Sequence, residues 1–338
     1  MTTLGILWYF LIFLLIAGYF VLDGFDLGTG VLSPFLAQTD GERSMIRRAI
    51  GPVWDGNEVW LLTAGGALFA AFAPAYATTF SGFYLAIMLV LFGLIIRAIS
   101  LEFGAHAEGF SAALCNIGFF LGSFLPALLF GVAVGNIYAG IPLDANGDYA
   151  GVPLLGLITP FTLLCGLLGL FMFCAAGAAW IALKTPLRCA MRQRAMRLRG
   201  VFQILAFIAF VAVSVFGHFV IQPAMAPELG ALRWICAILF AACMLFAIER
   251  GRHDYGDLQS FLAQSIAAIA LVFLLAASMF PALVVAAPGS LVPDITIATA
   301  AGSEATLGVM AVIACIGVPL VLIYHVIIYR VFYGRLER

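Results

Sequence analysis

A chain of 338 residues that is 64% hydrophobic and only 10% charged cannot bury its apolar surface in a single soluble core. Its formal net charge of −1 provides no basic excess that would favour nucleic acid as a partner. These figures exclude an ordinary soluble enzyme and predict an integral membrane protein.

Nine intervals of the sequence carry few or no charges and are long enough to span a membrane, because a helix rises about 1.5 Å per residue and the hydrocarbon core is about 30 Å thick. In chain order they are residues 4–22, 59–80, 81–96, 110–134, 154–183, 201–221, 229–248, 261–282 and 307–329. Arg97 and Arg233 interrupt the third and the seventh near one end. The sequence therefore predicts an all-α membrane protein, a bundle of nine transmembrane helices that forms one domain over residues 1–338.

The basic side chains fall on one side of these intervals. With the N-terminus outside, fifteen of the sixteen Lys and Arg residues lie in inner loops or at inner helix ends, and Arg233 is the exception. Because cytoplasmic loops carry the excess of Lys and Arg, this bias predicts a periplasmic N-terminus, a cytoplasmic C-terminus and an odd number of spans. The basic run over residues 184–199 is expected to meet anionic lipid at the inner surface.

Acidic side chains gather at the inner ends of the first three intervals. The set, with one arginine, is Asp23 and Asp26, Asp55 and Glu58, and Arg97 and Glu102. Members of the first two pairs are three residues apart and so share a helix face, and short connections keep consecutive helices adjacent. Neighbouring carboxylates in a low dielectric cannot all stay ionised, so they hold and pass protons. The pattern predicts a proton pathway formed by these five acids.

Other interpretations of the same residues stay open. Asp55 and Glu58 could be interfacial acids that favour the N-terminus of a helix. Arg97 could snorkel to the surface or balance charge instead of contacting a ligand. Trp54 fits the aromatic belt of a membrane interface, whereas the deeper Trp60 is either a core residue or the stacking wall of a ring-shaped ligand.

Histidine positions argue against a haem held by this chain alone. Only His218 and His325 fall within the predicted spans, and at about 1.5 Å per residue they differ in depth by roughly 20 Å, which excludes a shared iron. By depth, His218 with Met279 is the remaining pair. The seven cysteines form no C-x-x-C pair, so no metal site is predicted.

Five strings resemble subunit II of the cytochrome bd quinol oxidase family. They are L-D-G-F-D-L-G-T-G at 22–30, G-P-V-W-D-G-N-E-V-W-L-L-T-A-G-G-A-L-F-A-A-F at 51–72, S-G-F-Y-L-A at 81–86, G-S-F-L-P-A-L-L-F-G-V-A-V-G-N at 122–136 and M-F-P at 279–281. The similarity runs from the first predicted helix to the Tyr-Gly-Arg near Gly334. The second string is the most specific.

This resemblance implies a haem-less scaffold for a pseudo-symmetric, haem-bearing subunit I, in a bacterial inner-membrane complex that oxidises quinol and reduces dioxygen to water. Haem b and haem d are implied in subunit I, small single-helix accessory subunits are common, and ubiquinone or another quinone can lie in subunit II. Asp26, Asp55 and Trp54 match family positions linked to proton uptake or to that quinone, with Arg97 and Trp60 as further candidate contacts. The subtype, including the cyanide-insensitive class, stays open.

A proton-coupled secondary transporter is the alternative function, because it would use the same carboxylates. Such a protein is expected to show inverted repeats and helices broken near the middle of the membrane. Neither feature is visible in the sequence.

Overall fold

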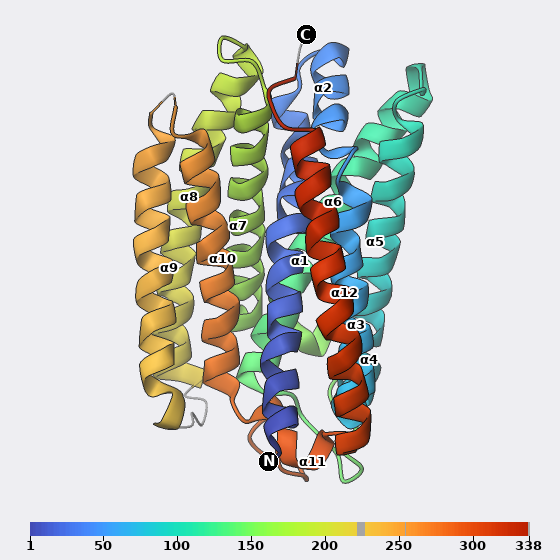
Figure 1. Ribbon diagram of the computed structural model, residues 1–338, viewed down its shortest axis with the longest axis vertical. Coiled ribbons are helices and arrows are strands. Elements are labelled where there is room, and N and C mark those ends of the chain that lie inside the picture. The colour runs from blue at the N-terminus through green and yellow to red at the C-terminus, as the bar shows by residue number, and fades with distance from the viewer. Residues whose placement is uncertain (222–226, 254, 337–338) are drawn as a thin grey trace.

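The computed structural model describes residues 1–221, 227–253 and 255–336. Its long helices run side by side along one axis, and the start of α1 and the end of α12 lie at opposite ends of the bundle (Figure 1). Within the described residues, eight helices are long and apolar enough to cross a membrane. They are α1 (Thr3–Leu36), α5 (Tyr84–Phe103), α6 (Gly109–Ala139), α7 (Pro160–Lys184), α8 (Ala190–Phe216) continued by the π-turn η2 (Gly217–Ile221), α9 (Gly230–Gly251), α10 (Asp257–Met279) and α12 (Glu304–Val331). The prediction of an all-α membrane protein is confirmed.

The interval predicted as the second span is split into two shorter helices, α3 (Trp54–Ala71) and α4 (Ala73–Gly82). Phe72 leaves the helical conformation between them, and Pro74 cannot donate the backbone hydrogen bond that would continue α3. The carbonyl of Ala71 at this break accepts a hydrogen bond from the backbone N–H of Gly302, at 2.9 Å. The amphipathic helix α2 (Asp40–Ile50) connects α1 to α3.

Several helices extend beyond the charge-free intervals that predicted them. α1 continues to Leu36 through Asp23 and Asp26, both fully buried, and α5 continues through the buried Arg97 to Phe103. α8 begins at Ala190, so most of the basic run is helical. These charges do not end the helices because other helices supply partners for them: Asp23 pairs with Arg97, Arg192 and Arg199 pair with Asp257, and Asp26 accepts a hydrogen bond from the amide of Asn57.

Helix α1 runs through the middle of the bundle and packs closely on α7. A Cβ atom at Gly28 would lie 1.7 Å from the carbonyl oxygen of Phe173, and one at Gly177 would lie 2.3 Å from the backbone nitrogen of Thr29. Only glycine allows this approach of two backbones. Nearby, the ring of Phe25 stacks on Trp180 with centroids 4.4 Å apart.

The end of the bundle where α1 begins is closed by short elements between the helices. Strands β1 (Ala282–Val284) and β2 (Ile295–Thr296) pair antiparallel and lead into α11 (Ile297–Ala300). The segment after α6 pairs with the one after β1, since Ile141 exchanges backbone hydrogen bonds with Val285 and Ala287. Two 3-10 turns, η1 (Leu155–Leu157) and η3 (Pro227–Leu229), precede α7 and α9.

Candidate functional site

A fully buried arginine joins the first three long segments of the chain near the end of the bundle where α12 finishes. Nη2 of Arg97 lies 2.7 Å from Oδ1 of Asp23 on α1 and 2.5 Å from Oε1 of Glu58 on α3. Helix α6 passes close behind α5 here, because a Cβ at Gly122 would lie 2.7 Å from the backbone nitrogen of Arg97. The arginine is thereby held against two carboxylates.

Asp26 lies on α1, as Asp23 does, and the side-chain amide of Asn57 connects it to α3. Nδ2 of Asn57 donates to Oδ2 of Asp26 at 2.7 Å and to the carbonyl of Leu22 at 3.1 Å. Oδ1 of Asn57 accepts from the hydroxyl of Tyr329 on α12, at 3.3 Å. Asp23, Asp26, Asn57, Glu58 and Arg97 are called the acid cluster below.

Buried polar atoms in and beside the acid cluster lack partners among the described side chains. They are the hydroxyl of Tyr19, Oδ2 of Asp23, Oδ1 of Asp26, and Nε and Nη1 of Arg97. Buried donors and acceptors of this kind are ordinarily satisfied by ordered water. The cluster also holds three carboxylates for one guanidinium, an excess of negative charge in a largely buried position that is relieved by binding protons.

The structure brings together three of the five predicted acids and leaves two outside. Asp55, in the first turn of α3, and Glu102, near the end of α5, are exposed. Arg97 is fully buried and bonded to two carboxylates, so of the two roles considered beside a ligand contact it balances charge and does not snorkel. Trp54 is half-buried against the core around α1 and α7.

The residues predicted to contact a quinone lie in different surroundings. Trp60 is buried, and its Nε1 donates to Nε2 of His325 at 3.3 Å, while Asp26 and Arg97 are enclosed by the contacts given above. Two small cavities, of about 40 and about 20 Å³, are lined by none of the five candidates.

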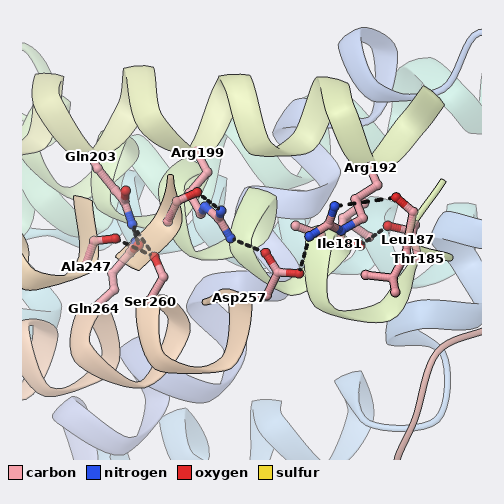
Figure 2. A network of polar contacts seen from close by, with 12 residues as sticks. Ile181, Thr185, Leu187, Arg192, Arg199, Gln203, Ala247, Asp257, Ser260 and Gln264 are labelled. Carbon is pink, nitrogen blue, oxygen red and sulfur yellow. Dashed lines mark hydrogen bonds and ion pairs between the residues drawn. The ribbon is translucent and has the colours of Figure 1, made fainter. Parts of the chain in front are cut away.

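A second buried charge network lies between α8 and α10 (Figure 2). Oδ1 of Asp257 accepts from Arg199 and Oδ2 from Arg192, both at 2.9 Å, and Arg335 approaches Oδ2 at 3.2 Å. Deeper along the same helices, the side-chain amide of Gln203 donates to Ser260 and to Gln264. The expectation that the whole basic run meets lipid is wrong for Arg192 and Arg199, because both are buried.

Sequence reasoning missed Asn57, Tyr329 and Asp257 as members of these networks. Asn57 is inside the most specific string, and Tyr329 follows His325 by one helical turn in an otherwise apolar interval, which was a usable signal. Asp257 stands just before the eighth interval, and its three arginine partners are 58 to 78 residues away in sequence. No local pattern connects them.

Comparisons with known proteins agree over nearly the whole chain. A sequence model described as "Cytochrome bd terminal oxidase subunit II" matches residues 4–332. The chain is 35% identical to the "Probable cytochrome oxidase subunit 2" of Haemophilus influenzae, with 99% of this chain and 95% of that protein covered. It is 32% identical to the "Cytochrome bd-I ubiquinol oxidase subunit 2" of Escherichia coli K12, with 99% and 96% covered. A chain of the bd oxidase from Geobacillus thermodenitrificans shares the fold, with a TM-score of 0.78 over 98% of this chain and 99% of that chain at 16% identity.

Proposed function

The chain belongs to the family of cytochrome bd terminal oxidase subunit II. We propose that it takes up protons at the cytoplasmic side through the acid cluster. It is subunit II of a quinol oxidase, an oxidoreductase complex that oxidises quinol and reduces dioxygen to water, and it is a multi-pass protein of the bacterial inner membrane. The resemblance seen in the sequence is confirmed. The relatives do not support the transporter alternative.

One observation carries the proposal of proton uptake: two carboxylates share one buried guanidinium, and a third, fully buried carboxylate on the same helix as Asp23 has no cation bonded to it. Asp23 and Asp26 are fully buried, and Arg97 bonds Asp23 and Glu58 but not Asp26. A carboxylate that burial and like charge disfavour accepts a proton readily, and the oxygens without partners give that proton a path onward. Asp55 and Glu102 join the proposed pathway as surface carboxylates, which would collect protons at the same end of the bundle.

The proposed topology has nine crossings, with a periplasmic N-terminus and a cytoplasmic C-terminus. In this arrangement α3 and α4 together make the second crossing, since each alone is short and they follow one another across residue 72. The opposite positions of the start of α1 and the end of α12 support an odd number of crossings. The acid cluster then lies on the cytoplasmic side, where protons are taken up.

Haem b and haem d of the complex are proposed to lie in subunit I, where they supply oxygen binding and electron transfer. In this chain His325 does not fit an axial ligand, because its Nε2 accepts from Trp60 and its Nδ1 lies 2.8 Å from the carbonyl of Val321. His218 is exposed whereas Met279 is buried, which gives no support to that pair.

Helix α12 supports the proposed role as a scaffold. Within the described residues it buries only Leu307 and His325, so most of its apolar side chains face outward. We assign this outer surface of the chain to subunit I, to lipid and to any small single-helix accessory subunit.

A quinone held by this chain is a separate proposal, and Trp54 and Asp55 are the most accessible of its five candidate residues. Trp54 is half-buried and Asp55 is exposed at the start of α3, so both could reach a head group at the surface of the bundle. Measuring the quinone content of the purified complex tests this. A Trp54→Ala variant is expected to lose the quinone, and an unchanged content would remove Trp54 from the site.

Replacing Asp26 by asparagine tests the proposed proton uptake. The variant keeps the hydrogen bond to Asn57 through its amide oxygen but cannot take up a proton at this position, so quinol-driven oxygen consumption by the purified complex should fall about tenfold or more. Asp40→Asn is the matched control, since Asp40 is 96% exposed on α2 at the same end of the bundle. Wild-type activity of the Asp26 variant, with normal assembly, would remove the relay role.

A further inference from the structure

We propose that Glu58 is the carboxylate through which protons enter the acid cluster, and that it passes them to Asp23. This inference rests on the proposed proton uptake and adds an order to it: Glu58 is outermost, and Asp23 and Asp26 lie inside. Three observations carry it: the different exposure of the three carboxylates, the guanidinium nitrogen shared by Glu58 and Asp23, and the oxygens that have no partner.

Exposure separates Glu58 from the other two carboxylates. The side chain of Glu58 is 24% exposed, whereas Asp23 and Asp26 are fully buried. Of the three, Glu58 alone can exchange a proton with the surroundings of the chain without passing it through another side chain. Asp55, three residues earlier on α3, is exposed next to it and adds negative charge at the same place.

One nitrogen atom holds Glu58 and Asp23 together. Oε1 of Glu58 and Oδ1 of Asp23 both bond Nη2 of Arg97, so these two oxygens can be no more than about 5 Å apart. Nη1 of Arg97 and Oδ2 of Asp23 have no partner among the described side chains, although both are buried. A turn of the Glu58 side chain about its own rotatable bonds, or one bridging water, is enough to connect the two carboxylates.

The charges around Glu58 come from three helices. Arg97 on α5 attracts its ionised form, while Asp23 on α1 and Asp55 on α3 repel it. With Arg97 between them, Glu58 and Asp23 as carboxylates leave a net charge of −1, and one added proton makes the three groups neutral. The arginine therefore favours a state in which one proton is shared by two carboxylates.

One proton moves from the surroundings to Asp23 in two steps. Glu58, as a carboxylate, takes one proton from outside and becomes a carboxylic acid, which weakens its bond to Arg97. It then donates this proton to Asp23, so that Asp23 becomes the acid and Glu58 returns to a carboxylate that binds Arg97 again. One proton has moved inward, no bond between heavy atoms has changed, and Glu58 is ready for the next proton. Asp23 and the partnerless Oδ1 of Asp26 continue the path on α1.

Glu58→Gln is the decisive variant, because an amide keeps an oxygen for Arg97 but cannot carry the proton. In the purified complex, oxygen consumption should fall about tenfold, and the loss should grow as the medium is raised from about pH 6 to about pH 8, where protons are scarcer. Anaerobic reduction of the haems by quinol, which takes up no proton for oxygen chemistry, should keep its wild-type rate. Glu58→Asp should recover part of the activity, and Glu108→Gln, an exposed acid at the same end, should behave as wild type.

The outcomes separate this inference from the proposed function. If Glu58→Gln keeps the wild-type rate and pH profile while Asp26→Asn is slow, protons enter elsewhere and this inference is overturned, but proton uptake through the cluster stands. If both variants are as active as the wild type, both are overturned. If Glu58→Gln slows anaerobic haem reduction as much as oxygen consumption, Glu58 has a structural role and the inference also fails.

Discussion

Replacing Asp257 with asparagine is expected to destabilise the bundle strongly, because this one carboxylate neutralises arginines that have no access to solvent. The side chains of Arg192 and Arg199 are 3% and 0% exposed and bond opposite oxygens of Asp257 (Figure 2). Arg335, at 31% exposure, is the third partner. Asparagine keeps nearly the same shape but provides one acceptor oxygen and no charge.

The expected loss in the free energy of unfolding depends on the buried arginines that remain after the substitution. Removing one partner from a buried ion pair typically costs about 3 to 5 kcal/mol, since the other charge stays buried without compensation. Here two guanidiniums lose their counter-ion, so the upper part of that range is expected. Arg335→Gln removes a partner that is 31% exposed, together with its hydrogen bonds to the carbonyls of Ala182 and Thr185, while Asp257 keeps two other arginines, so it should cost about 1 to 2 kcal/mol.

Unfolding in mixed detergent micelles, followed by circular dichroism, measures these differences in the free energy of unfolding. A triple variant, Asp257→Leu with Arg192→Met and Arg199→Met, supplies the second arm, because apolar residues of similar volume often replace a buried ionic group without loss of stability. It should be more stable than Asp257→Asn alone. The reasoning is refuted if Asp257→Asn costs no more than Arg335→Gln, or if the triple variant is the less stable one.

Two further predictions concern packing and pH. Gly28→Ala should prevent normal assembly, since its methyl group would overlap a backbone carbonyl of α7, whereas Gly65→Ala, with nothing within 4 Å of its added Cβ, should assemble normally; recovery of the purified complex distinguishes them. Partial burial would raise the pKa of Glu42, but hydrogen bonds from the Gln38 backbone and from Arg194 outweigh it and hold that pKa below its usual range. A depressed folded-state pKa stabilises the fold above the unfolded value of about 4.3 and the effect is lost at lower pH. Glu42→Gln should therefore lower the melting temperature at neutral pH, and the difference from wild type should shrink as the pH falls below about 4.

The apolar intervals could be predicted from the sequence because hydrocarbon thickness sets the length of a spanning helix. The helix ends could not. Asp23 and Arg97 look like the ends of spans in a hydropathy profile, yet both lie inside helices because they neutralise each other across 74 residues of sequence. The break at residue 72 could not be predicted for a different reason. Pro74 lies in an uncharged stretch, so the hydropathy of the interval gives no sign that the helix is interrupted there.

The depth of the acid cluster could likewise be predicted, whereas the direction of each side chain could not. Asp55 and Asn57 are two residues apart on α3 and, at about 100° per residue, point to nearly opposite faces. The sequence does not state which face meets α1. In the structure Asn57 is fully buried against Asp26 and Asp55 is exposed. Two acids expected in the cluster are thus at the surface, and an amide that was not singled out lies at its centre.

The two buried networks are built from the same side-chain types in opposite ratios, and this ratio decides what each can do. Around Asp257, three guanidiniums surround one carboxylate, and a guanidinium does not release its proton near neutral pH, so this network carries a surplus of positive charge that an added proton would not relieve. Around Arg97, the ratio is reversed: two carboxylates bond one guanidinium and Asp26 adds a third negative charge beside them, a surplus that added protons relieve. Adding a positive charge to the network around Arg97 should therefore remove its ability to take up protons. Replacing Asn57 by lysine is the direct way to do this, and it should abolish proton uptake while leaving all three carboxylates in place.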